Sequence, residues 1–348
     1  MEEVKEDLSK PETFLNHLNS LLKDTGTFKN GLLISKPANQ WIRESSTRPR
    51  PKKLFSEFWY ENEVCILFAD TNTGKSILSV QIADSISRGE AIPGFQLEAP
   101  AQPVLLADFE LSDKQFETRY SNNYENHYQF SDNLRRIEIN PDAEINPGQT
   151  FEEYLFSSLQ ETIHQTQAKI LIVDNLTYLR SATETAKDAL PLMKELKRLK
   201  AKFNLSILSL AHTPKRDFSK PITRNDLQGS KMLINFCDSA FAIGESSEDK
   251  NMRYLKQIKS RNSELIFDAD NVCLCQLSKP YNFLNFELIG FGMEREHIKQ
   301  QNDNDRESLK EKAISLAQQG KSYRDIGREL GISHMKAARL IKQQIIKL

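Results

Sequence analysis

The residues whose types and spacing most clearly indicate chemistry are Gly74, Lys75 and Ser76. They follow a short apolar run at 64–69 and open an amphipathic stretch that reaches residue 88. Backbone N–H groups at a helix N-terminus are unpaired and lie at the positive end of the helix dipole, so they bind phosphate. The order of strand, loop, Gly-Lys-Ser and helix therefore predicts a phosphate-binding loop rather than a chance Gly-Lys-Ser at a helix start.

This loop is expected to bind ATP together with Mg²⁺. Lys75 should reach the β- and γ-phosphate oxygens, and the Ser76 hydroxyl should ligate the metal ion. Ala69 stands where the motif usually has its first glycine, and alanine would be mildly strained there if the backbone needed a positive φ. The expected nucleotide-binding residues are Ala69, Asp70, Thr71, Asn72, Thr73, Gly74, Lys75 and Ser76.

A carboxylate follows the next apolar run, residues 104–109. In an open α/β sheet, ligands bind at the carboxyl ends of the strands, so Glu110 is placed to orient and deprotonate a water molecule near the γ-phosphate. Asp108 precedes it on the opposite face of the strand and is the weaker candidate for this base. The alternative for Glu110 is a cap on a helix that starts near Ser112.

Two further strand ends carry polar side chains. The apolar run at 170–174 ends in Asp174, as in a Walker B element, and Asp174 is expected to hold Mg²⁺ largely through water. Many buried strands end in aspartate, so the P-loop upstream is what strengthens this interpretation. The run at 206–211 leads to His212, which is either a sensor that hydrogen-bonds the γ-phosphate or a structural histidine.

The pattern around these residues is that of a mostly parallel sheet flanked by helices, which is an α/β fold. Between residues 54 and 290, short apolar, β-branched runs alternate with longer amphipathic stretches. Strands are expected at 64–69, 104–109, 136–140, 170–174 and 206–211, and helices at 75–88, 112–124, 151–165 and 187–203. Strands expected at 239–243, 254–259, 272–277 and 283–288 would extend the sheet in antiparallel fashion.

With its motifs in this order, the chain resembles the RecA-fold hexameric ATPases, most closely the plasmid RepA-type and DnaB-type replicative helicases. The resemblance covers about residues 54–290 and implies a RecA-like P-loop core. The matching segments are 69–76, 109–119, 170–175 and 211–215, with weaker matches at 227–239 and 256–262.

The resemblance implies a ring, with six subunits as one expected number, and ATP at the interfaces between subunits. Arg261 would then be the arginine finger for a neighbouring subunit's γ-phosphate, with Lys259 beside it. Taken alone, these two residues fit the solvated edge of a strand equally well. The loops at 178–188 and 214–228 would face the central channel. The second loop would contact single-stranded DNA through Lys215 and Arg216, or it is simply a basic surface loop.

A compact helical unit is expected at the C-terminal end. Ser322 can cap one helix, Gly331 makes a turn, and a last helix follows. This pattern resembles the DNA-binding helix-turn-helix of resolvases and small repressors. The last helix would contact duplex DNA through His334, Lys336 and Arg339. The alternative is a three-helix module that docks on a protein.

Composition narrows the possible classes of protein. The chain has 348 residues and a net charge of −1, so it does not coat nucleic acid as a polycation, and any DNA-binding surface must be local. Its four cysteines lack zinc-site spacing and suit a reducing compartment. The N-terminus is charged and no apolar run is long enough to cross a bilayer, so a cytoplasmic protein without a membrane partner is expected.

These observations predict four parts. They are an N-terminal helical lead and arm at 1–53, an ATPase domain at 54–291, a linker at 292–306 and a helix-turn-helix domain at 307–348. Within the first part, residues 1 to about 30 are expected to be helical, and the proline-containing stretch at 36–53 is expected to be a loop or arm without regular structure. The expected function is Mg²⁺-dependent ATP hydrolysis by a ring helicase or motor in replication or mobilisation of a plasmid-like or mobile element. Two alternatives stay open: an ATP-switched DNA-binding regulator without unwinding activity, and a regulator whose ATP site is only structural.

Overall fold

The architecture was analysed in a computed structural model. It describes residues 27–145, 147–179, 186–214, 216–227, 230–298 and 303–332, together with residues 334, 337, 338, 340 and 341. The chain divides into two compact units, Met1–Pro51 and Lys52–Leu348, and each is described by itself.

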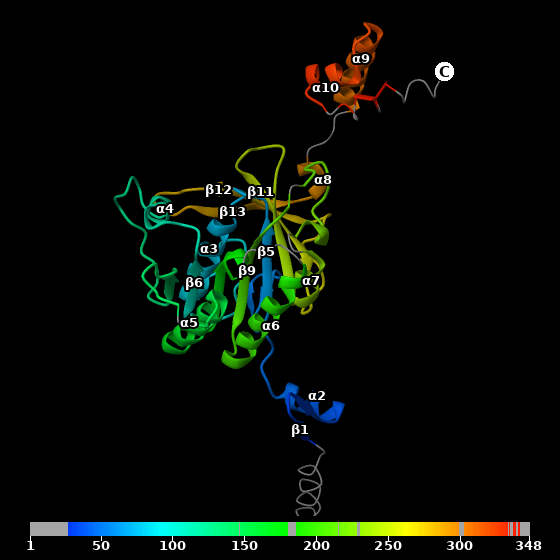
Figure 1. Ribbon diagram of the computed structural model, residues 1–348. Coiled ribbons are helices and arrows are strands. Elements are labelled where there is room, and N and C mark those ends of the chain that lie inside the picture. The colour runs from blue at the N-terminus through cyan, green and yellow to red at the C-terminus, as the bar shows by residue number, and fades with distance from the viewer. Residues whose placement is uncertain are drawn as a thin grey trace, which may run out of the picture. The chain divides into compact units, whose positions relative to one another are not determined.

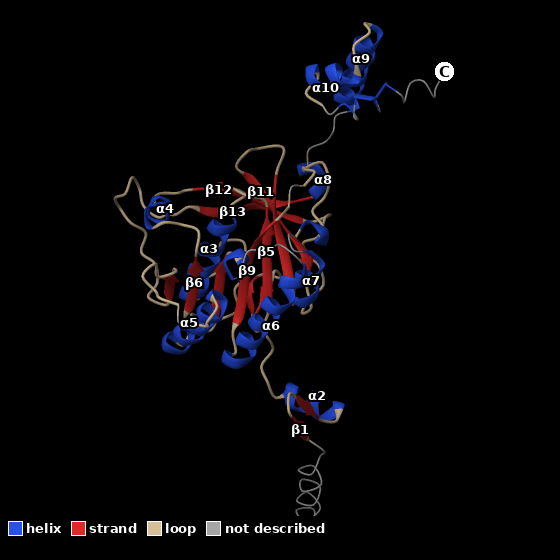
Figure 2. Ribbon diagram, viewed as in Figure 1, coloured by secondary structure: helices blue, strands red, loops and turns tan. Residues whose placement is uncertain are grey.

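The second unit is built on one large sheet, and its fold class is the α/β class predicted from the sequence (Figure 2). Among the described residues this sheet has nine strands in the order β13-β12-β11-β10-β5-β9-β8-β6-β7. The parallel strands are β5 (Val64–Ala69), β6 (Val104–Asp108), β7 (Leu134–Ile137), β8 (Ile170–Asp174), β9 (Ser206–His212) and β10 (Ser239–Glu245). The antiparallel strands are β11 (Met252–Lys259), β12 (Val272–Ser278) and β13 (Asn285–Gly292).

Three details of the predicted sheet were wrong. The strand at 239–245 pairs in parallel with β5, so the antiparallel extension begins one strand later, at β11. The strand expected at 136–140 lies at Leu134–Ile137, because it pairs residue for residue with β6. The last strand begins at Asn285 and runs to Gly292, and it is longer than expected because a register shift in β12 lets the pairing continue.

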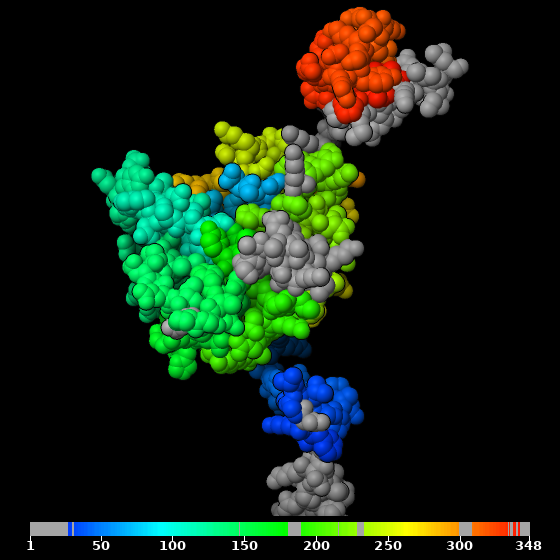
Figure 3. Space-filling model, in the orientation of Figure 1, coloured from blue at the N-terminus to red at the C-terminus, as the bar shows by residue number. Residues whose placement is uncertain are grey.

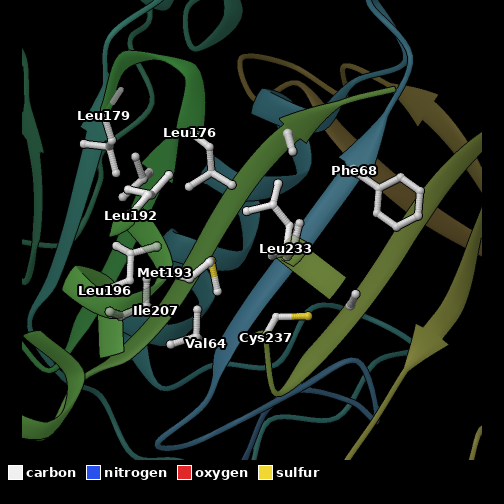
Figure 4. Close-up of a cluster of buried hydrophobic side chains, with 14 of the residues drawn as sticks. Val64, Phe68, Leu176, Leu179, Leu192, Met193, Leu196, Ile207, Leu233 and Cys237 are labelled. Carbon is white, nitrogen blue, oxygen red and sulfur yellow. The ribbon is translucent and has the colours of Figure 1, made fainter. Parts of the chain in front are cut away.

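Helices cover both faces of the sheet (Figure 1). The residues of β5 alternate in direction: Val64 and Phe68 face the helices α5, α6 and α7 (Figure 4), whereas Cys65 and Leu67 face α3. The segment between β6 and α5, cyan to green in Figure 3, forms one edge of this unit. The helices are α3 (Lys75–Arg88), α4 (Asp113–Arg119), α5 (Phe151–Thr166), α6 (Ala186–Phe203) and α7 (Ser230–Phe236), with 3-10 turns η1 (Leu176–Leu179) and η2 (Arg224–Asp226).

Helix α4 is shorter than the helix predicted at 112–124. It starts with a capping box in which Ser112 and Gln115 exchange side-chain-to-backbone hydrogen bonds, and it ends at Arg119. Beyond it, Asn123 and Tyr124 have positive φ angles of 51° and 62°, which a helix cannot accommodate. The chain therefore turns at the point where the sequence pattern suggested one more helical turn.

The first unit contains regular elements where a loop was expected. A hairpin joins β1 (Phe28–Asn30) to β2 (Leu33–Ser35), and α2 (Ala38–Ser46) follows. Residues 36–53 were predicted to lack regular structure because of their prolines, but Pro37 precedes the first helical turn, where proline is tolerated. The helical lead predicted for residues 1 to about 30 is wrong at 28–30, and residues 1–26 lie outside the described part. In the second unit, β3 (Lys53–Phe55) and β4 (Trp59–Tyr60) form a small hairpin.

The predicted linker at 292–306 is shorter than expected. The short helix α8 (Glu294–His297) belongs to the core, since Glu294 is fully buried and its carboxylate accepts hydrogen bonds from the Ile222 N–H, the Tyr254 hydroxyl and Lys256 Nζ. The sequence suggested a linker because this segment is polar, but two of its polar residues, Glu294 and His297, are buried.

Helices α9 (Asp303–Gln318) and α10 (Tyr323–Glu329) form the C-terminal part. A small cluster of buried side chains, Ala313, Ile326, Ala337 and Leu340, joins them to the start of a further helical segment. A Cβ on Gly327 would lie 2.7 Å from the Ile332 carbonyl oxygen, so the turn after α10 packs tightly against that helix. Most of the last predicted helix lies outside the described residues.

Candidate nucleotide site

The loop between β5 and α3 has the backbone geometry of a phosphate-binding loop. Asn72 and Gly74 take positive φ angles of 63° and 104°, and the Thr73 hydroxyl donates a 2.7 Å hydrogen bond to the Asp70 carbonyl. Gly74 then opens α3, where the Leu78 N–H makes the first helical hydrogen bond to its carbonyl. Ala69 is the last residue of β5 and has no positive φ, so the strain considered for an alanine there does not arise.

Lys75 is buried at the start of α3, with 6% of its surface exposed. Its Nζ donates to the carbonyl oxygens of Ala69 at 3.0 Å and Asp70 at 2.8 Å. Burial lowers the pKa of Lys75, and the negative charges of Asp174 and Glu110 oppose this shift. The ammonium group therefore lies against the loop carbonyls and within the electrostatic influence of both carboxylates.

Asp174, at the end of β8, meets Ser76 as a Walker B residue should. Burial raises the pKa of Asp174 to about 7, while a hydrogen bond from the Ser76 hydroxyl and the charge of Lys75 oppose the shift. Its Oδ1 atom is buried and has no hydrogen-bond partner among the described residues. A desolvated carboxylate oxygen without a donor, next to a hydroxyl, fits Mg²⁺, which prefers oxygen ligands and keeps several waters. Bound there, the metal ion would neutralise phosphate charge.

Asp108 has a structural role. Its Oδ1 accepts hydrogen bonds from the N–H groups of Glu110 at 3.2 Å and Leu111 at 3.0 Å, and its Oδ2 pairs with Arg136 at 3.0 Å. With both oxygens engaged and the side chain buried, Asp108 shapes the turn that presents Glu110.

Glu110 is joined to two residues from neighbouring strand ends. The Asn175 Oδ1 accepts from the Thr177 N–H at 2.8 Å, and this orients Asn175 Nδ2 to donate to Glu110 Oε1. His212 Nε2 lies 3.5 Å from Glu110 Oε1 and 3.1 Å from Asn175 Nδ2. A hydrogen bond with His212 lowers the pKa of Glu110, so the carboxylate stays ionised and able to accept a proton.

The alternative that Glu110 caps α4 is wrong, because Ser112 is the N-cap residue of that helix. The sequence interpretation placed Glu110 and His212 at one rim but gave Asn175 no role. The sequence signal that could have identified Asn175 was its position, as a polar residue directly after the Walker B aspartate.

The antiparallel strands complete the site from a distant part of the chain. A Cβ on Gly74 would lie 2.8 Å from Phe286 Cζ of β13, so the ring of Phe286 packs directly on the loop. The buried guanidinium of Arg253 in β11 donates to the Thr73 carbonyl at 3.0 Å. Neither Phe286 nor Arg253 was predicted from the sequence, and a basic residue between Met252 and Tyr254 was the only signal for either.

A cavity of about 550 Å³ lies above the loop. Lys75, Glu110 and His212 line it, and so do Gln115 and Arg119 of α4. Gln115 and Arg119 belong to a segment with family resemblance, but the sequence analysis gave them no role. The cavity thus joins the expected catalytic residues to one further cation from α4.

Lys259 and Arg261 lie far from this cavity within their own chain. Arg253 touches the phosphate loop at one end of β11 and Lys259 ends the strand, so about 20 Å separates them at about 3.3 Å per residue. Lys259 Nζ donates to the carbonyls of Ile234 at 2.5 Å and Cys237 at 2.7 Å. Arg261 is half-exposed and pairs with Asp238 at 3.2 Å. Neither residue can serve its own subunit's site.

The residues predicted to contact DNA are described only in part. The Arg216 guanidinium lies 5.6 Å from the Phe218 ring centroid and donates to the Lys220 carbonyl at 2.6 Å, so it stabilises its own loop. His334 is exposed at the start of a helical segment. Lys215, Lys336 and Arg339 lie outside the described residues.

The fold and this site define a P-loop ATPase. The AAA_25 family model, described as an AAA domain, matches residues 34–217, just over half of the chain. The chain therefore belongs to this family of AAA ATPase domains. No curated protein matches it. Within the described residues, every helix is too short or too polar to span a membrane.

Proposed function

We propose that this protein is a Mg²⁺-dependent ATPase that acts on DNA as a ring-forming helicase or motor. The observation that carries the proposal is the meeting of Glu110, Asn175 and His212 above Lys75, beside the unpartnered oxygen of Asp174. An ionised base, a phosphate-binding lysine and a metal-binding carboxylate are the parts that phosphoryl transfer to water requires. A site that only binds nucleotide has no need of the base.

The position of Arg261 supports the ring. Its guanidinium is half-exposed just beyond the end of β11 that lies away from the cavity, where another subunit could meet it. Arginine side chains supplied by a neighbour stabilise the charge of the transition state, and they make hydrolysis depend on assembly. The family resemblance assigns Arg261 and Lys259 this role.

The C-terminal helices support action on DNA. The order of α9, α10 and a further helical segment, with a close turn at Gly327, fits a helix-turn-helix, and residues 335–348 carry four basic residues and no acid. A sequence with this excess of basic residues suits contacts with the phosphates of the DNA backbone. The DNA bound there would be duplex, while single-stranded DNA would pass through the ring.

Three measurements test the proposal. Steady-state ATPase activity is expected to need Mg²⁺ and to rise with single-stranded DNA, a forked substrate should be unwound, and light scattering with ATP should give the mass of a ring. An Asp174→Asn variant should lose the Mg²⁺-dependent part of its ATP affinity.

Other outcomes separate the alternatives. Turnover without unwinding, with different duplex affinities in ATP and ADP, would favour the regulatory switch. Negligible turnover in every condition would contradict the ATPase itself and favour a structural nucleotide.

A further inference from the structure

The cavity contains a cation without an assigned role. Arg119 ends α4 and lines the space that Lys75, Glu110 and His212 also line. Among the described residues its guanidinium has no side-chain hydrogen bond or ion pair, and its Nη1 atom is buried without a partner. A desolvated guanidinium N–H without an acceptor is costly, and an anion beside it would remove that cost.

The backbone around Arg119 is held firmly. Lys279 Nζ, at the turn after β12, donates to the carbonyls of Thr118 and Ser121, each at 2.6 Å. The Leu284 N–H donates to the Arg119 carbonyl at 3.2 Å. These bonds fix the end of α4, while the capping box at Ser112 fixes its start. The backbone of α4 is therefore held at both ends. None of these hydrogen bonds involves the guanidinium of Arg119.

The charge of Arg119 acts on the proposed base. It is one of the positive charges that lower the pKa of Glu110, after the hydrogen bond with His212 and the charge of Lys75. Arg119 and Glu110 therefore face the same space. Arg119 does not neutralise Glu110 by direct pairing, since Asn175 and His212 are the groups in contact with that carboxylate.

We propose that Arg119 is a catalytic residue that contacts the γ-phosphate within its own subunit. This inference rests on the proposed ATP hydrolysis. In that reaction, a water oxygen bonds to the γ-phosphorus and the water proton goes to Glu110. The bond to the bridging oxygen breaks, and its electrons leave with ADP. In the transition state, negative charge is spread over the equatorial oxygens of the phosphoryl group that is being transferred, and the planar N–H fork of Arg119 would stabilise that charge.

The role differs from the one expected of Arg261. Arg119 would act on its own subunit's nucleotide, so its contribution needs no neighbour, whereas Arg261 would act across an interface. Lys75 and Arg119 are the lysine and the arginine among the described residues that line the cavity. Lys75 lies against the phosphate-binding loop, so Arg119 is a second cation, which would approach the γ-phosphate from α4.

Single-turnover hydrolysis by the full-length protein tests the proposal. Arg119→Ala should lower the rate about 10³-fold, the scale of a lost catalytic arginine, and should leave ADP affinity unchanged. Arg119→Lys should recover only part of the rate, because lysine lacks the planar fork. Guanidinium ion at millimolar concentration should partly restore Arg119→Ala. Lys114→Ala, on the exposed side of the same helix, is the matched control and should hydrolyse ATP normally.

Subunit mixing tests whether Arg119 acts on its own nucleotide. An equimolar mixture of Arg119→Ala and Glu110→Gln proteins should stay inactive, because every site carries one defect. Recovery of turnover in that mixture would overturn the proposal, and so would a normal rate for Arg119→Ala. If Arg119→Ala lost ADP affinity and guanidinium ion did not restore hydrolysis, Arg119 would have a structural role, and this result would also overturn the proposal. If the wild-type protein does not hydrolyse ATP, the proposed function itself is contradicted. That result is distinguishable from a failure of the proposal for Arg119, which would be seen only in the variants.

Discussion

The side-chain amide of Gln81 in α3 pairs with both backbone groups of Phe286 in β13. Gln81 Nε2 donates to the Phe286 carbonyl at 3.0 Å, and the Phe286 N–H donates to Gln81 Oε1 at 2.9 Å. All four groups are buried. This pairing ties the helix that follows the phosphate-binding loop to a strand about 200 residues later, and it holds the Phe286 ring over Gly74.

We expect Gln81→Met to lower the free energy of unfolding by about 2–4 kcal/mol, since each buried group left unpaired costs about 1–3 kcal/mol. Urea denaturation measures this change. Gln165→Met is the matched control: Gln165 is exposed, and its loss should change stability by less than about 0.5 kcal/mol. Equal effects of the two substitutions would show that the pairing with Phe286 contributes nothing.

We expect Gly74→Ala to weaken ATP binding at least about tenfold, because a left-handed φ costs an alanine about 1–2 kcal/mol and the new Cβ would meet Phe286. Adding Phe286→Leu should restore part of the affinity, since it removes the clash but leaves the strain. Fluorescent ATP titration measures both. Gly148→Ala is the control, because Gly148 also has a positive φ but no atom within 4 Å. Normal ATP affinity in Gly74→Ala would contradict the close packing.

We expect Glu110→Gln to lower turnover by about 10²–10⁴-fold, the usual contribution of a general base. ATP affinity should stay close to that of the wild type, since Lys75 and the loop amides remain. Glu117→Gln, on the same side of the sheet but hydrogen-bonded to Lys114, should leave turnover unchanged. Unimpaired hydrolysis by Glu110→Gln would remove the base assignment.

The pH dependence of hydrolysis should report the contact between His212 and Glu110. The hydrogen bond with His212 lowers the pKa of Glu110, so the base is ionised above its ordinary pKa and loses activity only as pH falls below that value. In His212→Gln the burial of Glu110 remains while the stabilising charge is lost, so its pKa should rise. The acid limb of kcat/KM should therefore move to higher pH. An acid limb that stays in place would show that His212 does not tune Glu110.

Lys259 and Arg261 should differ in what their loss affects. Lys259→Met should reduce stability by about 1–3 kcal/mol, since Lys259 donates to carbonyls at the end of α7. Arg261→Ala, an exposed ion-pair partner of Asp238, should cost less than about 1 kcal/mol but abolish turnover. Mixing Arg261→Ala with Glu110→Gln should restore part of the turnover. In mixed rings, some interfaces combine the intact Glu110 of one subunit with the intact Arg261 of its neighbour. Normal turnover by Arg261→Ala alone would exclude the finger.

Local features made most of the parallel sheet predictable. Buried parallel strands are short apolar runs, and the Gly-Lys-Ser sequence marks the start of α3, so β5, β8 and α3 lie within a residue of their predicted bounds. Glu110, Asp174 and His212 could be placed at one rim for the same reason, because Asp174 and His212 end such strands and Glu110 follows one closely. These residues lie at the same end of the sheet because the carboxyl ends of parallel strands all point that way.

What remained unpredicted depends on contacts between distant segments. Phe286 and Arg253 meet the loop only because the antiparallel strands β11 and β13 return to it, and apart from the presence of an arginine in β11 their own neighbourhoods do not indicate this. The linker was misread because Glu294 looks like a surface residue until Lys256 is seen beside it. Arg119 was passed over because its significance lies in the absence of a partner among the described residues, which a sequence cannot display.

The dependence of the phosphate loop on β10 to β13 has a practical consequence for shortened forms of the protein. The family match ends at residue 217, before any of these strands. A fragment cut there would strip β5 of its neighbour β10 and turn a fully buried apolar strand into a bare sheet edge, which is prone to aggregation. The smallest piece fit for isolated expression should therefore run from Lys52 to about residue 298.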